Sequence, residues 1–219
     1  MTEHSQAQKR DIHYWNTYYA RGICPTSPSA FAQYVATLVK PNCTLIDLGC
    51  GNGRDALFFA QNHLNVIAID LSDCAIEKLE GKENRTIEFL CDDFVNSSIH
   101  QANSYDYAYS RFTLHAIGKD QENELLRNVF CGLKQGGKFF IEVRGTKDPL
   151  YGLGHQIAKN TFVYNGHSRR FLVLDELIEN LIHVGFSIEY SAEQTGFAVY
   201  QNQDPPVIRV IATKRGEDE

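Results

Sequence analysis

The chain has 219 residues, 43% of them hydrophobic and 22% charged, which suits one well-buried domain and is short for two. Its net charge of −6 disfavours a nucleic-acid partner, because binding a phosphate backbone requires a basic surface. No apolar run reaches the roughly 20 residues of a membrane span, and the first ten residues lack the apolar core of a signal peptide. We therefore expect a cytoplasmic protein with no membrane insertion.

The N-terminal 40 residues are predicted to be helical. Residues 2–10 are polar and are expected to fray, whereas aromatic residues recur at helical spacing from Asp11 until Gly22 ends the pattern. These aromatic residues are Tyr14, Trp15, Tyr18 and Tyr19. They would either pin the helix to a sheet edge or form a lid over a bound cation. A second helix is expected from Ser29 to Lys40, so we treat residues 1–40 as a helical lid and 41–219 as the main domain.

The most informative stretch runs from Thr44 to Leu71. An apolar run at 44–48 ends in glycines at positions 49, 51 and 53, a helical pattern follows to residue 60, and a second apolar run at 66–69 closes on Asp70. Glycines let the backbone approach a ligand, and the helix start behind them offers unpaired N–H groups. An acidic residue about 20 positions further on is where a parallel sheet binds ribose hydroxyls, so an adenosine-containing cofactor is predicted.

The glycine spacing distinguishes between cofactors. A dinucleotide fingerprint needs Gly-x-Gly-x-x-Gly, but here the third slot holds Arg54 and the glycine stands one residue early, at Gly53. A long cation at the helix start suits a ligand that carries a carboxylate. Arg54 and the lack of a second domain together disfavour an NAD-dependent oxidoreductase.

The sequence Asp-Leu-Gly-Cys-Gly-Asn-Gly at 47–53, followed by Asp70, resembles motif I of the class I S-adenosylmethionine-dependent methyltransferases. The resemblance implies S-adenosylmethionine as cofactor. It also implies a single-domain, Rossmann-like α/β fold: a mostly parallel seven-stranded sheet with an antiparallel C-terminal strand and helices on both faces. The aromatic N-terminal helix is similar to that of tellurite-resistance and thiopurine methyltransferases.

The remaining elements follow the order of that family. Ser72 is a good N-cap for a helix at 73–80, and a third strand is expected at 86–90. At the corner that follows, the resemblance implies an acidic residue for the adenine amino group beside an apolar residue that packs on the ring. Asp93 and Phe94 match this pattern, and Asp92 is the alternative acid.

The second half of the chain supplies the rest of the sheet. Strands are expected at 105–110 and 138–143, with a helix at 120–133 and a glycine turn at 135–137 between them. A helix at 174–184 stopped by Gly185, and two antiparallel strands at 186–190 and 207–213, complete the pattern. Because ligands bind beyond the carboxyl ends of such strands, the segment from Arg111 to Ile117 should face the transferred methyl group.

Residues 144–170 form the least regular segment, and we expect them to be an irregular substrate-binding loop. The loop and the fourth strand end supply four arginines, whose guanidinium groups are suited to bidentate binding of carboxylate or phosphate. The arginines are Arg111, Arg144, Arg169 and Arg170. An anionic acceptor is therefore predicted. As an alternative, Arg169 and Arg170 would only pair on the surface with Asp175 and Glu176.

The candidate residues fall into three groups. The cofactor group is Trp15, Asp47, Gly49, Cys50, Gly51, Arg54, Asp70, Leu71, Asp92, Asp93, Phe94, Ser110 and Arg111. The substrate group is Tyr14, Tyr18, Arg144, Tyr164, Arg169 and Arg170. The catalytic group is His115, His167 and Arg111, because an alcohol acceptor needs a base that works near neutral pH, whereas a phosphate or carboxylate oxygen does not. The six cysteines include no Cys-x-x-Cys pair, so neither a disulfide framework nor a metal site is indicated.

The loop sequence Tyr-Asn-Gly-His-Ser-Arg-Arg and the residues after the fourth and fifth strands look like those of bacterial methyltransferases associated with surface-polysaccharide synthesis. The resemblance implies O-methylation of a sugar, carboxylate or phosphoryl oxygen, on a small molecule or a glycan, by a monomer or homodimer. Alternatives are methylation of a small thiol or acid metabolite, and a non-catalytic sensor of S-adenosylmethionine or S-adenosylhomocysteine. Nucleic-acid methylation is disfavoured further, because residues 110–113 lack the Asn/Asp-Pro-Pro-Tyr/Phe motif.

Overall fold

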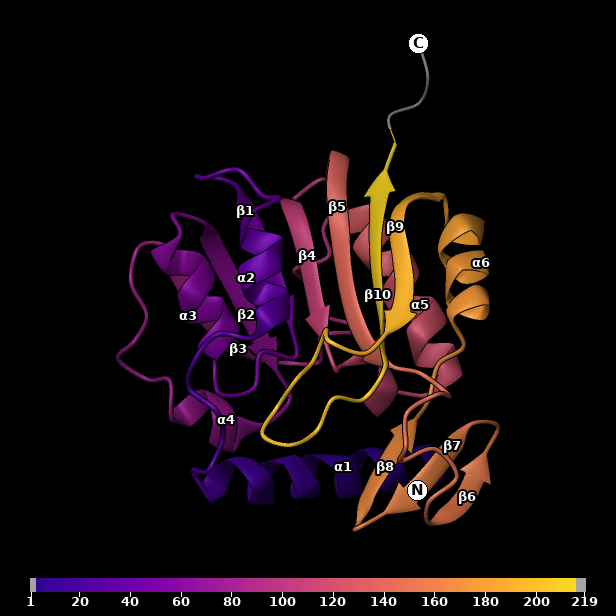
Figure 1. Cartoon of the computed structure of the whole chain (residues 1–219). Coiled ribbons are helices and arrows are strands. Elements are labelled where there is room, and N and C mark those ends of the chain that lie inside the picture. Colours follow the sequence, from indigo (N-terminus) through magenta and orange to yellow (C-terminus); the bar gives the residue numbers. More distant parts are fainter. Residues whose placement is uncertain (1–2, 216–219) are drawn as a thin grey trace.

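The computed structural model describes the backbone of residues 3–215 and the side chains of residues 12–215, built around one seven-stranded sheet (Figure 1). Its strand order is β3-β2-β1-β4-β5-β10-β9. The strands are β1 (Thr44–Leu48), β2 (Asn65–Asp70), β3 (Ile87–Cys91), β4 (Tyr105–Arg111), β5 (Leu133–Arg144), β9 (Phe186–Gln194) and β10 (Val207–Lys214). Neighbouring strands are parallel except at β10, which is antiparallel to β5 and β9. The predicted sheet is confirmed.

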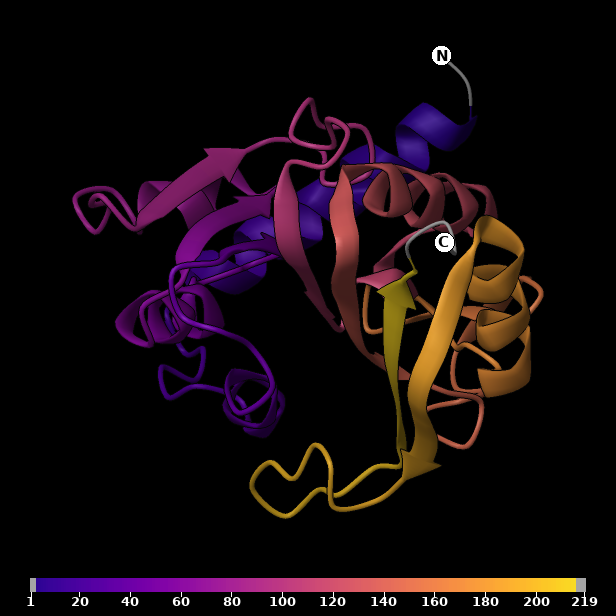
Figure 2. The same cartoon turned by 90° about the horizontal axis from the view of Figure 1, so that it is seen from above.

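Helices cover both faces of this sheet, as predicted (Figure 2). They are α1 (Glu3–Ala20), α2 (Ala30–Ala36), α3 (Arg54–Gln61), α4 (Asp73–Glu77), α5 (Lys119–Gly132) and α6 (Leu174–Val184), with a 3₁₀ turn η1 at Leu114–Ala116. Side chains of a strand point alternately to the two faces, so β4 sends Ala108 into the core under α5 and α6, and Tyr107 and Tyr109 into the core under α2 and α3. Within the described residues no helix is long and apolar enough to cross a membrane.

The expectation of an irregular loop at 144–170 is wrong. Three short strands, β6 (His155–Ala158), β7 (Thr161–Tyr164) and β8 (His167–Arg170), form a second, antiparallel sheet. Asn165 and Gly166 connect β7 to β8 with φ angles of 51° and 75°, the left-handed pair that a tight two-residue hairpin requires. The Asn-Gly dipeptide between two short segments was the signal in the sequence for this hairpin.

Several element boundaries also differ from the predictions. Helix α1 begins at Glu3 instead of Asp11, α2 ends at Ala36 instead of Lys40, and α4 ends at Glu77 instead of residue 80. Strand β9 continues to Gln194 instead of ending at residue 190. Strand β5 begins at Leu133, because Leu133 already pairs with Tyr105 before the residues of the expected turn interrupt the register. The predicted caps are confirmed: the Ser29 and Ser72 hydroxyls accept N–H bonds at the starts of α2 and α4, and α6 ends at a left-handed Gly185.

Helix α1 and the small sheet lie beside the carboxyl ends of the parallel strands, below the central sheet in Figure 1. Helix α1 contacts both α4 and β8, and β8 contacts η1. Because ligands of doubly wound sheets bind beyond these strand ends, the two elements enclose the region where a site is expected.

Lys214, the last residue of β10, ties the end of α5 to the sheet. Its buried ammonium donates to the carbonyls of Leu133 at 2.7 Å and Cys131 at 3.4 Å, and to the side chain of Asn103 at 3.3 Å. The last carbonyls of a helix lack intrahelical partners, and a cation there is also favoured by the helix dipole.

We predict that Lys214→Met lowers the free energy of unfolding by about 2 kcal/mol, because buried carbonyls lose their donor. The matched control is Lys138→Met, which removes a more exposed ion pair with Glu189 and should cost less than about 1 kcal/mol. Urea unfolding of both variants checks this difference. Equal losses in the two variants would show that Lys214 does not act as a helix anchor.

Candidate functional site

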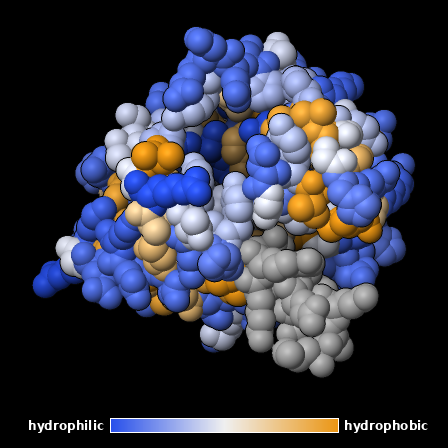
Figure 3. Space-filling view, turned by 90° about the horizontal axis from the view of Figure 1, so that it is seen from below, coloured by the Kyte–Doolittle hydropathy of each residue, from blue (hydrophilic) through white to orange (hydrophobic). Residues whose placement is uncertain are grey.

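A cavity of about 580 Å³ lies at the carboxyl ends of the parallel strands. Its walls come from α1, the glycine turn after β1, the ends of β2 and β4, η1 and the small sheet. The face of the molecule seen from below is hollowed at this place (Figure 3). The site therefore stands where the sheet topology predicts a ligand.

The glycine turn forms one wall of the cavity. Gly49, Gly51 and Gly53 have φ angles of 78°, 55° and 72°, in the left-handed region that favours glycine. A Cβ atom on Gly49 would come within 2.7 Å of the Thr113 side chain, and one on Gly51 would collide with the Tyr19 hydroxyl. The turn therefore has no room for side chains, and Gly49 and Gly51 bring its backbone to the cavity wall, where Tyr19 packs against Gly51.

Asp70, at the end of β2, fixes this turn and lines the cavity. Its Oδ2 accepts the N–H of Gly51 and its Oδ1 accepts the N–H of Ser72, both at 2.8 Å. Burial raises the pKa of the carboxyl, and the two backbone bonds act in the opposite direction. Each oxygen keeps a free lone pair, so the carboxylate can also accept hydrogen bonds from a ligand's hydroxyl groups.

Asp47, at the end of β1, is a second buried acid on the cavity wall. Its side chain is almost completely buried, and Oδ2 has no hydrogen-bond partner among residues 12–215. Burial, and then the charges of Asp55 and Asp70, raise its pKa well above the usual range. A cationic ligand group, such as an amine, would satisfy the unpaired oxygen and relieve the repulsion between the acids.

The corner after β3 places only one of the two candidate acids at the cavity. Asp93 and Phe94 line it, whereas Asp92 is exposed and its Oδ1 accepts the N–H of Asp93. Asp93 in turn accepts the N–H of Val95 at 2.9 Å, which fixes its carboxylate. The geometry thus favours Asp93 over Asp92 as a ligand-binding residue.

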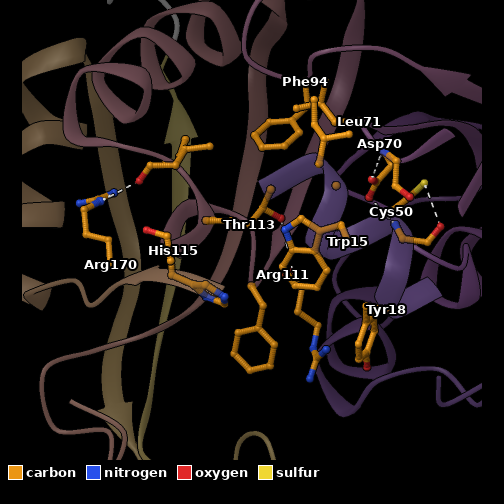
Figure 4. Close-up of a pocket in the computed structure, with 18 of the residues that line it drawn as sticks. Trp15, Tyr18, Cys50, Asp70, Leu71, Phe94, Arg111, Thr113, His115 and Arg170 are labelled. Carbon is orange, nitrogen blue, oxygen red and sulfur yellow. Dashed lines mark hydrogen bonds between the residues drawn. The ribbon is translucent and has the colours of Figure 1, made fainter. Parts of the chain in front are cut away.

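Helix α1 covers the glycine turn. Trp15, Tyr18 and Tyr19 line the cavity, and in Figure 4 Trp15 lies between Asp70 on one side and His115 on the other. Two contacts anchor the helix to α4: Ser72 Oγ donates to Asn16 Oδ1 at 2.6 Å, and Lys78 Nζ donates to the carbonyls of Tyr19 and Ala20.

The segment after β4 carries a strained residue between two cations. Phe112 has a φ of 58°, which is unusual for a bulky side chain and is found most often at functional sites. The guanidinium of Arg111 lies 4.3 Å from the centroid of its ring, and that of Arg144 lies 5.2 Å away. Glu142 holds Arg111 in place, since its Oε1 accepts from Arg111 Nε at 2.9 Å and its Oε2 accepts from Arg209 Nε at 2.7 Å.

The two candidate catalytic histidines are neighbours. His115 lines the cavity, and the His167 ring, 6.3 Å away between centroids, stacks on Tyr14 at 4.6 Å and packs edge-on against Trp15 at 5.0 Å. Burial, and then the charges of Arg169 and Arg144, lower the pKa of His115 well below its usual value and that of His167 to about 4. Both imidazoles are therefore neutral at pH 7 and can accept a proton.

The structure brings most of the predicted site residues to the cavity. Those that line it are Trp15, Tyr18, Asp47, Gly49, Cys50, Gly51, Arg54, Asp70, Leu71, Asp93, Phe94, Arg111, His115 and Arg170. Those that do not are Tyr14, Asp92, Ser110, Arg144, Tyr164, His167 and Arg169. Ser110 is fully buried and Tyr164 is 39% exposed. Tyr14, Arg144, His167 and Arg169 stand together just behind Trp15, Phe112 and His115.

Arg170 lines the cavity but is engaged by the protein. Its Nε donates to the carbonyl of Ile117 at 3.0 Å, and its Nη2 donates to the carbonyl of Leu114 at 3.1 Å and to Glu122. The alternative of a surface ion pair with Asp175 or Glu176 is therefore wrong for this residue, which joins β8 to η1 and α5.

The sequence did not single out a few residues of the site. Asn16 binds Ser72 at the start of α4, Tyr19 covers Gly51, and Gly118, Lys119 and Gln121 line the cavity beyond η1. Tyr19 had a signal, because it lies on the same aromatic run as Trp15. The other four had none, since their contacts depend on how the chain folds over the strand ends.

Other lining residues fall inside segments that were predicted to face a ligand. Thr113 and Ile117 belong to the segment 111–117, and the lining residues of β6 and β7 belong to the segment 144–170.

Comparisons with known proteins agree with this geometry. A family model described as "Methyltransferase domain" matches residues 45–137. The carboxy-S-adenosyl-L-methionine synthase of Pseudoalteromonas atlantica is 30% identical over 185 residues, which cover 78% of this chain and 72% of that protein. The enzyme of the same name from Idiomarina loihiensis is 30% identical over 148 residues, covering 62% of this chain and 60% of the relative's length.

A solved structure supports the fold. The 1,6-didemethyltoxoflavin-N1-methyltransferase of Burkholderia thailandensis, crystallised with 1,6-didemethyltoxoflavin and S-adenosylhomocysteine, superposes with a TM-score of 0.76. The match covers 99% of this chain and 92% of that one at 18% identity, so it concerns the fold alone. Together with the sequence matches and the glycine turn, it establishes that the chain belongs to the class I S-adenosylmethionine-dependent methyltransferases.

Proposed function

We propose that the protein is an enzyme that transfers a methyl group from S-adenosylmethionine to a small-molecule acceptor carrying an anionic group. The observation that carries this proposal is one cavity in which the glycine turn, Asp70 and the unpaired Asp47 meet the basic segment after β4. The acidic end of the cavity also holds Arg54, and Arg111 stands at the end of β4. The acids suit a cationic cofactor, and the guanidinium groups suit anionic groups of the ligands.

The residues present fit the cofactor. Asp70 would accept the ribose hydroxyls, and Asp93 with Phe94 would hold the adenine. Asp47 has an unpaired oxygen for the amino group, and Arg54, whose Nη1 makes only a 3.3 Å bond to the Ser27 carbonyl, is available for the carboxylate. When bound, S-adenosylmethionine supplies an already activated methyl group. We propose that α1 acts as the lid of this cavity.

The chain's own contribution to methyl transfer is then positioning, because an in-line displacement from an activated donor needs little further chemistry. His115 is neutral and lines the cavity, but its strongly lowered pKa makes it a weaker base for an alcohol acceptor than the near-neutral base that the sequence predicted. A carboxylate or phosphate oxygen would need only the cations that hold it in line. In both cases Trp15 and Phe112 exclude water from the reacting atoms.

For the acceptor, we propose an oxygen of a sugar, carboxylate or phosphoryl group, on a small molecule or a glycan-linked precursor of the kind used in surface-polysaccharide synthesis. Arg111 and Arg144 lie around Phe112, and although Glu142 and Asp148 pair with them, the additional charge of Arg169 beside Arg144 supports an anionic acceptor. An acid or thiol metabolite remains the alternative acceptor. A non-catalytic sensor is the alternative function, but it would not require the buried histidines beside the cavity.

The carboxy-S-adenosyl-L-methionine synthases favour a second candidate function, in which the cofactor itself carries the carboxylate. The match to the Pseudoalteromonas relative covers 78% of this chain. Mass spectrometry of ligand retained by the purified protein separates the two. A carboxylated form of the cofactor would support the second candidate, and S-adenosylmethionine or S-adenosylhomocysteine would support the first.

Trp15 provides a direct test of the cofactor, because it is the single tryptophan of the chain and lines the cavity. We expect S-adenosylhomocysteine to change its fluorescence in a saturable way and NAD to have no effect. The variant Trp15→Phe should lose the signal but still bind S-adenosylhomocysteine in calorimetry. Saturable binding of NAD, or of neither compound, would refute the proposed function.

Asp70 and Asp92 form a matched pair for testing the adenosine site. Asp70→Asn should weaken S-adenosylhomocysteine binding at least about 10-fold, because the charged acceptor is lost. Asp92→Asn removes the same charge nearby, but its side chain is exposed and outside the cavity, so affinity should change less than about 2-fold. Calorimetry measures both affinities. A comparable loss in Asp92→Asn would contradict this placement of the adenosine.

The neutral state of His167 predicts a pH dependence of stability. The folded pKa is about 4 and the unfolded pKa is 6.5, so between these values only the unfolded state binds the proton, and stability falls as the pH falls. From pH 7 to pH 5 this group alone should cost about 2 kcal/mol. In His167→Gln that part of the decrease should disappear, whereas His183→Gln, at an exposed position of α6, should keep it. Urea unfolding at the two pH values tests this, and an unchanged decrease in His167→Gln would show that His167 is not held neutral.

A further inference from the structure

A cationic cluster lies behind the wall of the cavity. It consists of Arg144 at the end of β5 and of His167 and Arg169 on β8. The two guanidinium groups are close enough that the charge of Arg144 lowers the pKa of Arg169. The cluster borders the cavity through two aromatic residues that line it, Phe112 and Trp15. The Arg144 guanidinium lies 5.2 Å from the centroid of the Phe112 ring, and the His167 ring centroid lies 5.0 Å from that of the Trp15 ring.

Several polar atoms in and beside this cluster lack partners. His167 is 1% exposed, and neither of its ring nitrogens has a hydrogen-bond partner among residues 12–215. The same holds for Arg169 Nε and for His115 Nδ1. Buried polar side-chain atoms in native proteins are nearly always hydrogen-bonded, so four orphaned atoms side by side indicate a place for a polar ligand.

The charges of the cluster determine the sign of that ligand. Glu142 is shared between Arg111 and Arg209, and Asp148 pairs with Arg144. Across the part of the chain whose side chains are described, no carboxylate forms an ion pair with Arg169. Arg169 is partly buried, its Nε has no hydrogen-bond partner among residues 12–215, and the neighbouring Asp148 is already paired with Arg144. A partly buried guanidinium without its own counter-ion favours an anion as the missing ligand.

We propose that Arg144, His167 and Arg169 form a subsite for one carboxylate or phosphate group of the methyl acceptor. Because the three residues do not line the cavity themselves, the anionic group would have to reach them past Phe112 and Trp15, which lie between the cluster and the cavity. There the two guanidinium groups and an imidazole N–H would donate to its oxygens. The assignment of the anion to the acceptor rests on the proposed function, whereas the anion site itself does not. Binding would also place a proton on His167 and leave His115 neutral and facing the cavity.

The test is thermal unfolding of the full chain in phosphate or malonate, with sodium chloride at equal ionic strength as reference. For the wild type, one of the two anions at saturation should raise Tm by roughly 2–4 °C above the reference. Arg169→Met should lose this response and, without added anion, unfold at a higher temperature than the wild type, because an uncompensated buried charge is gone. Arg85→Met, at an exposed position before β3, should keep the wild-type response.

The outcomes separate the possibilities. A larger response to phosphate indicates a phosphoryl group, and a larger response to malonate indicates a carboxylate. No response beyond that to chloride, or an undiminished response in Arg169→Met, would overturn the subsite. S-adenosylhomocysteine binding to the wild type and to Arg169→Met is measured in parallel. If the wild type does not bind S-adenosylhomocysteine, the proposed function is refuted. A stabilising response of the wild type to phosphate or malonate would in that case still support the anion subsite.

A measurement on the wild type covers the case in which Arg169→Met does not fold. Imidazole nitrogen NMR follows the titration of His167, assigned from its absence in His167→Gln. The effective anion should raise the pKa of His167 from about 4 by at least about one unit, whereas chloride at equal ionic strength should not. An unchanged titration in both anions would reject the subsite independently of any variant.

Discussion

The carboxylate of Asp70 holds together the parts from which the whole site is built. Its two oxygens bind the N–H of Gly51 in the turn after β1 and the N–H of Ser72 at the start of α4. Ser72 in turn binds Asn16 on α1. One partly buried acid thereby links the central strands, the glycine turn, the next helix and, through Ser72, the N-terminal helix.

Burial is the main cause of the unusual ionisation around the cavity, and neighbouring charges add to it. Burial, and then the charges of Asp55 and Asp70, raise the pKa of Asp47. Burial, and then the charges of Arg169 and Arg144, lower the pKa values of His115 and His167. Under the proposed function, the acids would attract the sulfonium cation and the guanidinium groups would attract an anionic acceptor.

The elements around the cavity differ in how firmly they are held. The strand ends belong to two hydrophobic cores, one on each face of the sheet. Helix α1 is joined to α4 mainly through polar contacts of Asn16 and of the carbonyls of Tyr19 and Ala20. Aromatic packing of Tyr14 and Trp15 on His167 joins it to β8. Movement of α1 would break these contacts, whereas movement of the strands would expose a core. The proposed lid and the central sheet thus differ in the kind of interaction that holds them.

The sequence by itself determined the sheet, most of the helices and the cofactor end of the site. Local signals were sufficient there, because the glycines at 49–53, the acid at Asp70 and the caps at Ser29 and Ser72 act within one strand–turn–helix unit. The small sheet at 155–170 was missed although Asn165 and Gly166 marked its hairpin, since a long polar segment was read as a loop. Only the tertiary structure decided which arginines have a paired carboxylate. Glu142 and Glu122 are far in sequence from Arg111 and Arg170, and Asp148, although near Arg144, could not be distinguished in the sequence from other acids. Pairing across the fold leaves Arg169 without an ion-paired carboxylate among the described residues. The fold of the corner after β3 likewise places Asp93, and not Asp92, at the cavity.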